Sequence, residues 1–565
     1  MRNFKRKLVV LTAIFVVFAG ACTLEPADRT VVPDQAVSVE PGNPPPVTGA
    51  ELKKERRQKR ASADSAARAP ALMDRAVAFE ALSASGLAQL RAPSEPVNRE
   101  NYARFTDNPL QRVAEAPFST FSIDVDTGAY SNMRRMLNAG SRPVKDAIRT
   151  EELINYFAYD YPRPGRRDKP FSIHTEAGPS PWNPDTHLLH IGVQGYEVSR
   201  EDMPASNLVF LVDVSGSMQS PDKLELLKSA LRLLVRQLGA DDRVSLVVYA
   251  GASGVVLEPM AGDRKATIIA ALDGLTAGGS TNGGAGIRLA YALAQQAYIK
   301  DGINRVILAT DGDFNVGTVD FEMLKQLVEE RRGQGIGLTT LGFGNGNYND
   351  HLMEQLADAG NGNYAYIDTL GEARKALVEE MSSTLMTIAK DVKIQVEFNP
   401  ATVAEYRLIG YENRALARED FSNDRVDAGE IGAGHSVTAI YEIALTGSAG
   451  QRLADSRYQP EQRAPGSTQE LALVRVRYKQ PDGESSRLIE QPVRRTELAG
   501  KLDATSGNYR FAAAVAGFGQ ILRGGRYTGD FGYDGVLDLA RGARGDDPFG
   551  YRGEFLQLAG LASSL

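Results

Sequence analysis

The chain is almost devoid of cysteine: its 565 residues include one, Cys22, so no disulfide can form within the chain. None of its five histidines shows the His-Glu-x-x-His spacing of a zinc protease. The sequence contains no Gly-x-x-x-x-Gly-Lys-Ser/Thr loop and no Gly-x-Ser-x-Gly elbow, which argues against common nucleotide-binding and hydrolase chemistry. The net charge is −7, with basic residues scattered along the chain, which argues against nucleic-acid binding. These absences favour a protein that is not an enzyme and has no nucleic-acid partner.

The long apolar run at the N-terminus is the first positive feature. It extends from Leu8 to Phe18, follows four basic residues, and is shorter than the roughly 20 residues of a spanning helix, so it is typical of an export signal. The residues after it, Ala19-Gly20-Ala21-Cys22, resemble a bacterial lipobox. This resemblance implies a signal peptide over residues 1–21 and a lipid anchor on Cys22; an ordinary signal peptide that ends near a cysteine is the alternative. Thr23 after the cysteine implies the outer membrane, facing the periplasm, in a Gram-negative cell.

Composition and periodicity divide the remainder into four parts. Residues 22–100 are rich in proline and charge and poor in aromatic residues, which predicts a disordered tether. Residues 101–200 show a strand pattern from Phe118 to Asp126 and a helix from Thr127 to Leu137, and are predicted to form an α+β flanking domain. Residues 205–385 alternate short apolar strands with amphipathic helices. Residues 390–565 are predicted to form a β-rich domain with terminal helices.

The alternation over residues 205–385 predicts an α/β fold: a doubly wound, Rossmann-like domain with a mostly parallel central sheet. Its first strand, Leu208 to Val212, is apolar throughout, as expected of a strand buried on both faces. Asp213-Val214-Ser215-Gly216-Ser217 follows it directly. Since ligands of such sheets bind at the carboxyl ends of the strands, the loop with Thr281 and the Thr310-Asp311-Gly312 turn are expected at the same edge. Hydroxyl and carboxylate oxygens suit Mg²⁺ or Mn²⁺.

This set of motifs resembles the metal-ion-dependent adhesion site of von Willebrand factor A (VWA) domains. The resemblance implies that Ser215, Ser217 and Thr281 supply hydroxyl ligands, that Asp213 and Asp311 bind the metal directly or through water, and that a partner protein contributes an Asp or Glu carboxylate. Phe118 to Leu137, the segment Glu151-Glu152-Leu153-Ile154-Asn155-Tyr156-Phe157 and the β-rich tail resemble the flanks of bacterial VWA-domain lipoproteins of the YfbK-like family. This resemblance covers about residues 100–565. The alternative interpretation is that Asp213 and Ser215 cap a helix and the glycines only form turns.

The predicted function is therefore that of a lipid-anchored protein of the cell envelope, which binds a protein partner through Mg²⁺ or Mn²⁺. The alternative is a structural or assembly scaffold whose flanking domains make the working contacts. Two further features stay open at this point. Asp124 and Asp126 are either ligands of a second cation or solvated carboxylates at a helix entry, the interpretation that we favour. Asp313 is either a residue that supports the metal site or a solvated loop residue.

Overall fold

The computed structural model describes residues 100–565, except 124–125, 166–168, 281–282, 313–320, 347, 427, 455–467, 482 and the side chain of Ser382. The expected signal peptide, Cys22 and the tether therefore lie outside the described residues, as do Asp124, Thr281 and Asp313. Among the helices of the described part, none is long and apolar enough to cross a membrane.

A six-stranded sheet forms the centre of the α/β domain. Its strand order is β10-β9-β8-β5-β6-β7, and every neighbouring pair is parallel except β6 and β7. The bounds are β5 (Ser206–Asp213), β6 (Arg243–Tyr249), β7 (Ser253–Ala261), β8 (Ile303–Thr310), β9 (Gly337–Phe343) and β10 (Tyr364–Ile367). The predicted doubly wound fold with a mostly parallel sheet is confirmed.

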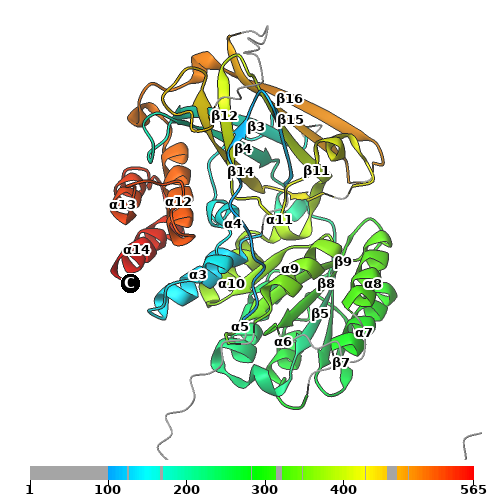
Figure 1. Cartoon of the computed structure of the whole chain (residues 1–565). Helices are drawn as coiled ribbons and strands as arrows, with labels where there is room; N and C mark the ends of the chain where they lie inside the picture. The colour runs from blue at the N-terminus through cyan, green and yellow to red at the C-terminus, as the bar shows by residue number, and fades with distance from the viewer. Residues whose placement is uncertain are drawn as a thin grey trace, which may run out of the picture. The chain divides into compact units, whose positions relative to one another are not determined.

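The apolar run in β5 is buried on both faces because helices cover both sides of the sheet (Figure 1). Leu208, Phe210 and Val212 join one core, and Val209 and Leu211 join the other, as the two-residue period of a strand requires. The first core includes side chains of α5 (Leu226–Val235), α6 (Lys265–Asp273), α10 (Leu370–Arg374) and α11 (Met381–Leu385). The second includes side chains of α7 (Gly283–Gln296), α8 (Phe321–Gly333) and α9 (Asp350–Ala359).

The two flanks of this domain combine into one pair of antiparallel sheets. The first sheet has the order β1 (Gln111–Arg112), β12 (Val403–Ile409), β14 (Ser436–Leu445), β4 (His187–Gly195) and β3 (Phe171–Pro179). The second has the order β13 (Ile431–Gly432), β11 (Thr387–Phe398), β15 (Glu470–Lys479) and β16 (Ser486–Arg494), with β2 (Phe118–Ser122) paired to β11. Ile191 opposes Ala439 in one sheet and Ser122 opposes Lys393 in the other. Residues 101–200 and 390–565, which the sequence divides into separate flanks, therefore share both sheets and one apolar core.

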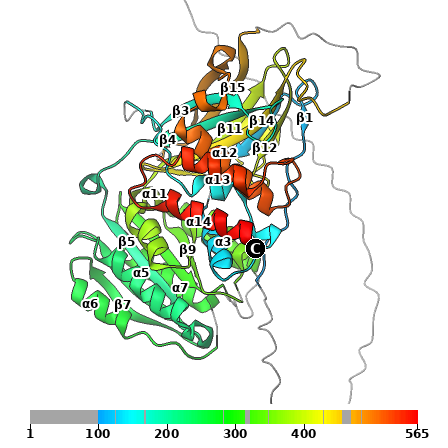
Figure 2. The ribbon, with the colours of Figure 1, turned by 90° about the vertical axis from the view of Figure 1, so that its left-hand side faces the viewer.

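Five helices share an apolar core on the outer side of the first sheet, where α4 packs on β14 and α12 contacts β3 and β4 (Figure 2). They are α3 (Gly128–Asn138), α4 (Thr150–Asn155), α12 (Gly507–Leu522), α13 (Tyr533–Gly542) and α14 (Tyr551–Ser564). Leu188 of β4 and Ile440 of β14 face this helical layer, whereas the adjacent residues Leu189 and Ala439 face the core between the sheets. Helix α3 starts one residue after Thr127, as predicted, although the Thr127 side chain makes no capping hydrogen bond.

Candidate metal site of the α/β domain

The loop after β5 brings two serine hydroxyl groups together at the carboxyl edge of the sheet. The backbone N–H of Ser215 donates to Asp213 Oδ1 at 2.9 Å, and Ser215 Oγ lies 2.9 Å from Ser217 Oγ. Between the serines, Gly216 N–H donates to the Gly279 carbonyl at 3.0 Å, and a Cβ at Gly216 would lie only 3.3 Å from that oxygen. A glycine at this position allows the loop to approach the glycine-rich segment closely.

Hydroxyl groups from two neighbouring strands hold the Asp213 carboxylate. Tyr249, at the end of β6, donates to Asp213 Oδ2 at 3.2 Å, and Thr310, at the end of β8, donates to the same oxygen at 2.9 Å. Asp213 is fully buried, and this burial raises the pKa of its carboxyl group, with a further increase from the nearby Asp311 carboxylate. The sequence analysis did not predict these two donors. Their positions at the ends of two strands could have indicated that both lie at the edge of the sheet that carries the site.

A buried lysine links Asp311 to the serine loop. Lys223, in the π-helical turn Pro221–Glu225 before α5, donates to Asp311 Oδ2 at 2.8 Å and to the Ser217 carbonyl at 3.0 Å. Gly344, with φ +74°, lies so close that a Cβ there would be 2.2 Å from Lys223 Cε. The sequence analysis did not predict this lysine either, because its contact with Asp311 joins residues 88 positions apart.

Four of the five predicted ligands can be placed. Ser215 contacts both Asp213 and Ser217, and Asp311 reaches this group through Lys223. Thr281 lies outside the described residues. The loop that precedes it is anchored to the same place, because Gly278 N–H donates to the Val214 carbonyl at 2.7 Å and Gly279 accepts from Gly216.

The donor set of this site consists of carboxylate and hydroxyl oxygens, which suits Mg²⁺ or Mn²⁺ rather than a metal that prefers nitrogen or sulfur. The described residues contain no cluster of three His, Cys, Asp or Glu side chains arranged to hold a metal. A cation here would therefore depend on serine and threonine oxygens. Lys223 pairs with Asp311, whereas the buried Asp213 has no ion pair among the described residues, so a bound cation would offset the remaining negative charge.

Asp126, considered above as a solvated carboxylate, has a structural role instead. It is 4% exposed, accepts from the Tyr364 backbone N–H at 2.8 Å and pairs with Arg414 at 3.5 Å. The favoured interpretation of Asp126 as a solvated residue is therefore wrong. The strand pattern correctly placed Asp126 just before a helix. It could not reveal that β10 and the loop with Arg414 pack against Asp126 and bury it.

Sequence comparison assigns most of the chain to described families. Residues 207–380 match the von Willebrand factor type A domain, residues 383–565 match the family described as "Uncharacterized protein YfbK, C-terminal", and residues 96–190 match the family described as "von Willebrand factor". Uncharacterized protein YfbK of Escherichia coli (strain K12) is 48% identical over 472 residues, which cover 82% of this chain and 81% of that protein.

Two more distant similarities cover smaller shares of the chain. Inter-alpha-trypsin inhibitor heavy chain H3 of Homo sapiens is 24% identical over 260 residues, which cover 42% of this chain and 28% of that protein. The solved structure of a von Willebrand factor type A protein from Catenulispora acidiphila is 16% identical, with a TM-score of 0.37, over 69% of this chain and 89% of that one.

Proposed function

Because the chain belongs to the YfbK family and carries a von Willebrand factor type A domain, we propose that it is a cell-envelope lipoprotein that binds a protein partner through Mg²⁺ or Mn²⁺. Domains of this type are often protein-interaction modules. The observation that carries the proposal is the meeting of the Ser215 and Ser217 hydroxyls, 2.9 Å apart, beside the buried carboxylates of Asp213 and Asp311. We propose no enzymatic activity.

In this proposal Ser215, Ser217 and Thr281 hold the ion, and Asp213 and Asp311 bind it directly or through water. Tyr249 and Thr310 keep the Asp213 carboxylate in one orientation, which is the usual role of groups that hydrogen-bond a metal ligand. Three of the five ligand groups are neutral hydroxyls, and the Lys223 ammonium offsets one of the two carboxylates, so a bound divalent ion leaves the site with net positive charge. That charge would attract an Asp or Glu carboxylate of the partner.

Calorimetric titration of Mg²⁺ and Mn²⁺ into the full chain in detergent tests the metal site. Thr281→Ala removes one hydroxyl ligand without changing the buried strands, so we expect metal affinity to fall about tenfold or more. Asp213→Ala should lower the affinity further, because it also removes negative charge beside the cation. Thr267→Ala, on the exposed side of α6, is the matched control and should bind like the wild type. Equal affinities in all four proteins would refute the site.

Partner capture from detergent-solubilised envelopes, with and without a chelator, tests the rest of the proposal. We expect partners that depend on the metal to be lost in the chelator and from the Thr281→Ala protein, and to be retained by Thr267→Ala. Partners that stay bound in every case would instead favour the scaffold function, in which the sheets and helices outside the α/β domain make the contacts.

A further inference from the structure

Arg305 is a buried cation at the opposite edge of the sheet from the candidate metal site. It lies near the start of β8, whose other end carries Thr310, and it pairs in register with Gly337 of β9. The residue is 6% exposed. Its Nη1 donates to Thr339 Oγ1 at 2.8 Å, whereas its Nε has no hydrogen-bond partner. Within the described residues no carboxylate forms an ion pair with it.

A guanidinium group has five N–H donors and stays protonated in proteins, so Arg305 carries a full charge with most of its donors unused. Burial lowers the pKa of Arg305, and the Glu430 carboxylate only partly opposes this effect. An isolated buried charge is strongly unfavourable unless a counter-ion or hydrogen-bonding groups compensate it. A bound anion beside Arg305 would therefore stabilise its buried positive charge.

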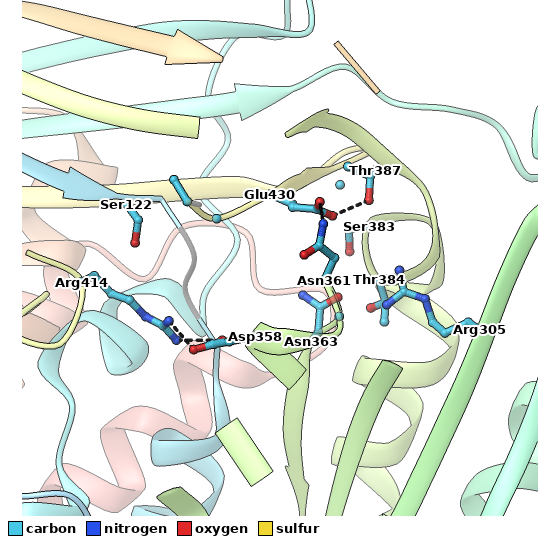
Figure 3. Close-up of a pocket in the computed structure, with 14 residues that line it drawn as sticks. Ser122, Arg305, Asp358, Asn361, Asn363, Ser383, Thr384, Thr387, Arg414 and Glu430 are labelled. Carbon is cyan, nitrogen blue, oxygen red and sulfur yellow. Dashed lines mark hydrogen bonds and ion pairs between the residues drawn. The ribbon is translucent and has the colours of Figure 1, made fainter. Parts of the chain in front are cut away.

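A cavity of about 190 Å³ opens beside this guanidinium. It lies where residues 361–363, before β10, meet α11 and the start of β11, and its wall is polar (Figure 3). The lining includes Arg305, Asn361, Asn363, Ser383, Thr384 and Thr387. The volume is below the roughly 300–1,000 Å³ of pockets for drug-sized ligands, so the cavity suits a small molecule.

The other charged groups of the cavity wall already have partners. Glu430 accepts hydrogen bonds from Asn361 and, at 2.9 Å, from Thr387. Arg414 pairs with Asp358 at 2.7 Å, on the far side of the cavity from Arg305 (Figure 3). Arg305 differs from them because, among the described residues, it makes one hydrogen bond and no ion pair, and Glu430 acts on it only beyond ion-pair distance.

We propose that this cavity binds a small oxyanion, a carboxylate or phosphate group on a small molecule, through the guanidinium of Arg305. Planar N–H pairs of arginine match the oxygens of both groups. The hydroxyl and amide groups of Thr384 and Asn363, toward which the Arg305 side chain extends in Figure 3, provide further polar contacts for the body of the ligand. Because the site is at the amino ends of the strands, the inference is independent of the proposed metal site.

The test titrates inorganic phosphate and, separately, acetate into the full chain by calorimetry, at ionic strength held constant with chloride. We expect the wild type to bind at least one of the two anions, and the preferred anion identifies phosphate or carboxylate as the recognised group. Arg305→Met should weaken that binding about tenfold or more, because it removes charge-assisted hydrogen bonds. Arg288→Met, which removes an exposed arginine of α7, is the charge-matched control and should bind like the wild type.

A second variant covers the case in which Arg305→Met does not fold. Thr384→Leu narrows the cavity and leaves Arg305 in place, so it should also weaken binding while the thermal midpoint without ligand stays near that of the wild type. Absence of phosphate and acetate binding to the wild type would overturn the proposal and leave water as the only occupant. Wild-type affinity in a folded Arg305→Met or Thr384→Leu protein would overturn it as well.

Discussion

Glu151, in the first turn of α4, is expected to make the stability of the fold depend on pH. Its side chain is buried, and Oε2 has no hydrogen-bond partner among the described residues. Burial, followed by repulsion from the Glu412 carboxylate, raises the pKa of Glu151 from 4.5 to about 7. Gly410, with φ +79°, brings the chain so close that a Cβ there would lie 2.7 Å from Glu151 Oε2. Little room therefore remains for water to solvate the charged form.

The sign and size of the effect follow from this pKa. Below about pH 4.5 the carboxyl group is protonated in both the folded and the unfolded chain, so it adds no pH dependence to the free energy of unfolding. Between about pH 4.5 and pH 7 the folded chain keeps a proton that the unfolded chain releases, so the free energy of unfolding falls as the pH rises. A difference of about 2.5 pKa units corresponds to about 3 kcal/mol, lost in full above pH 7.

The variant Glu151→Gln removes this titration and keeps the shape of the side chain. Relative to the wild type, it should gain about 3 kcal/mol between pH 5 and pH 8. With an unfolding entropy of about 2.1 cal/mol/K per residue, and a compact unit of roughly 470 residues, this gain corresponds to a rise in melting temperature of about 3 °C. Differential scanning calorimetry at several pH values between 5 and 8 measures it, with the exposed Glu419→Gln as the matched control.

The reasoning would be refuted if Glu151→Gln and the wild type showed parallel stability curves from pH 5 to pH 8. A variant that became less stable than the wild type as the pH rose would show that the fold stabilises the charged carboxylate, contrary to its buried environment.

Two other predictions concern the anchor and the buried ion pairs. Cys22→Ser should release the protein from the membrane fraction or leave an uncleaved precursor, as measured by fractionation and gel migration; unchanged behaviour would contradict the lipid anchor. Arg134→Met should lower the free energy of unfolding by about 3–5 kcal/mol, because Arg134 pairs with the buried carboxylates of Asp368 and Glu372 and with Glu554. Denaturant titration measures that loss against the exposed Arg541→Met control, and a loss below about 1 kcal/mol would contradict the prediction.

The sequence alone predicted the architecture of the α/β domain. The uninterrupted apolar run from Leu208 to Val212 indicated a strand buried on both faces, and the structure places its alternate residues in two different cores. The motif from Asp213 to Ser217 follows directly, so its position at the carboxyl edge needed only the local order of strand and loop. Such features are readable from sequence because they depend on residues a few positions apart.

The tertiary structure decided which distant residues meet. Lys223 reaches Asp311, the Tyr249 and Thr310 hydroxyls orient Asp213, and Asp126 is buried against Arg414. None of these contacts has a periodic signal, because each joins elements that become neighbours only when the sheets assemble.

The same reason explains why the flanks were divided into separate parts. Gln111 pairs with Tyr406, and Phe121 pairs with Ile394, although the whole α/β domain lies between these residues in the sequence. Strand periodicity identifies which face of a strand is buried, but it does not identify the partner strand. The sequence therefore determined the local elements and the position of the candidate metal site. Only the closed fold decided that the two flanks share a core and that Arg305 is enclosed with no ion pair among the described residues.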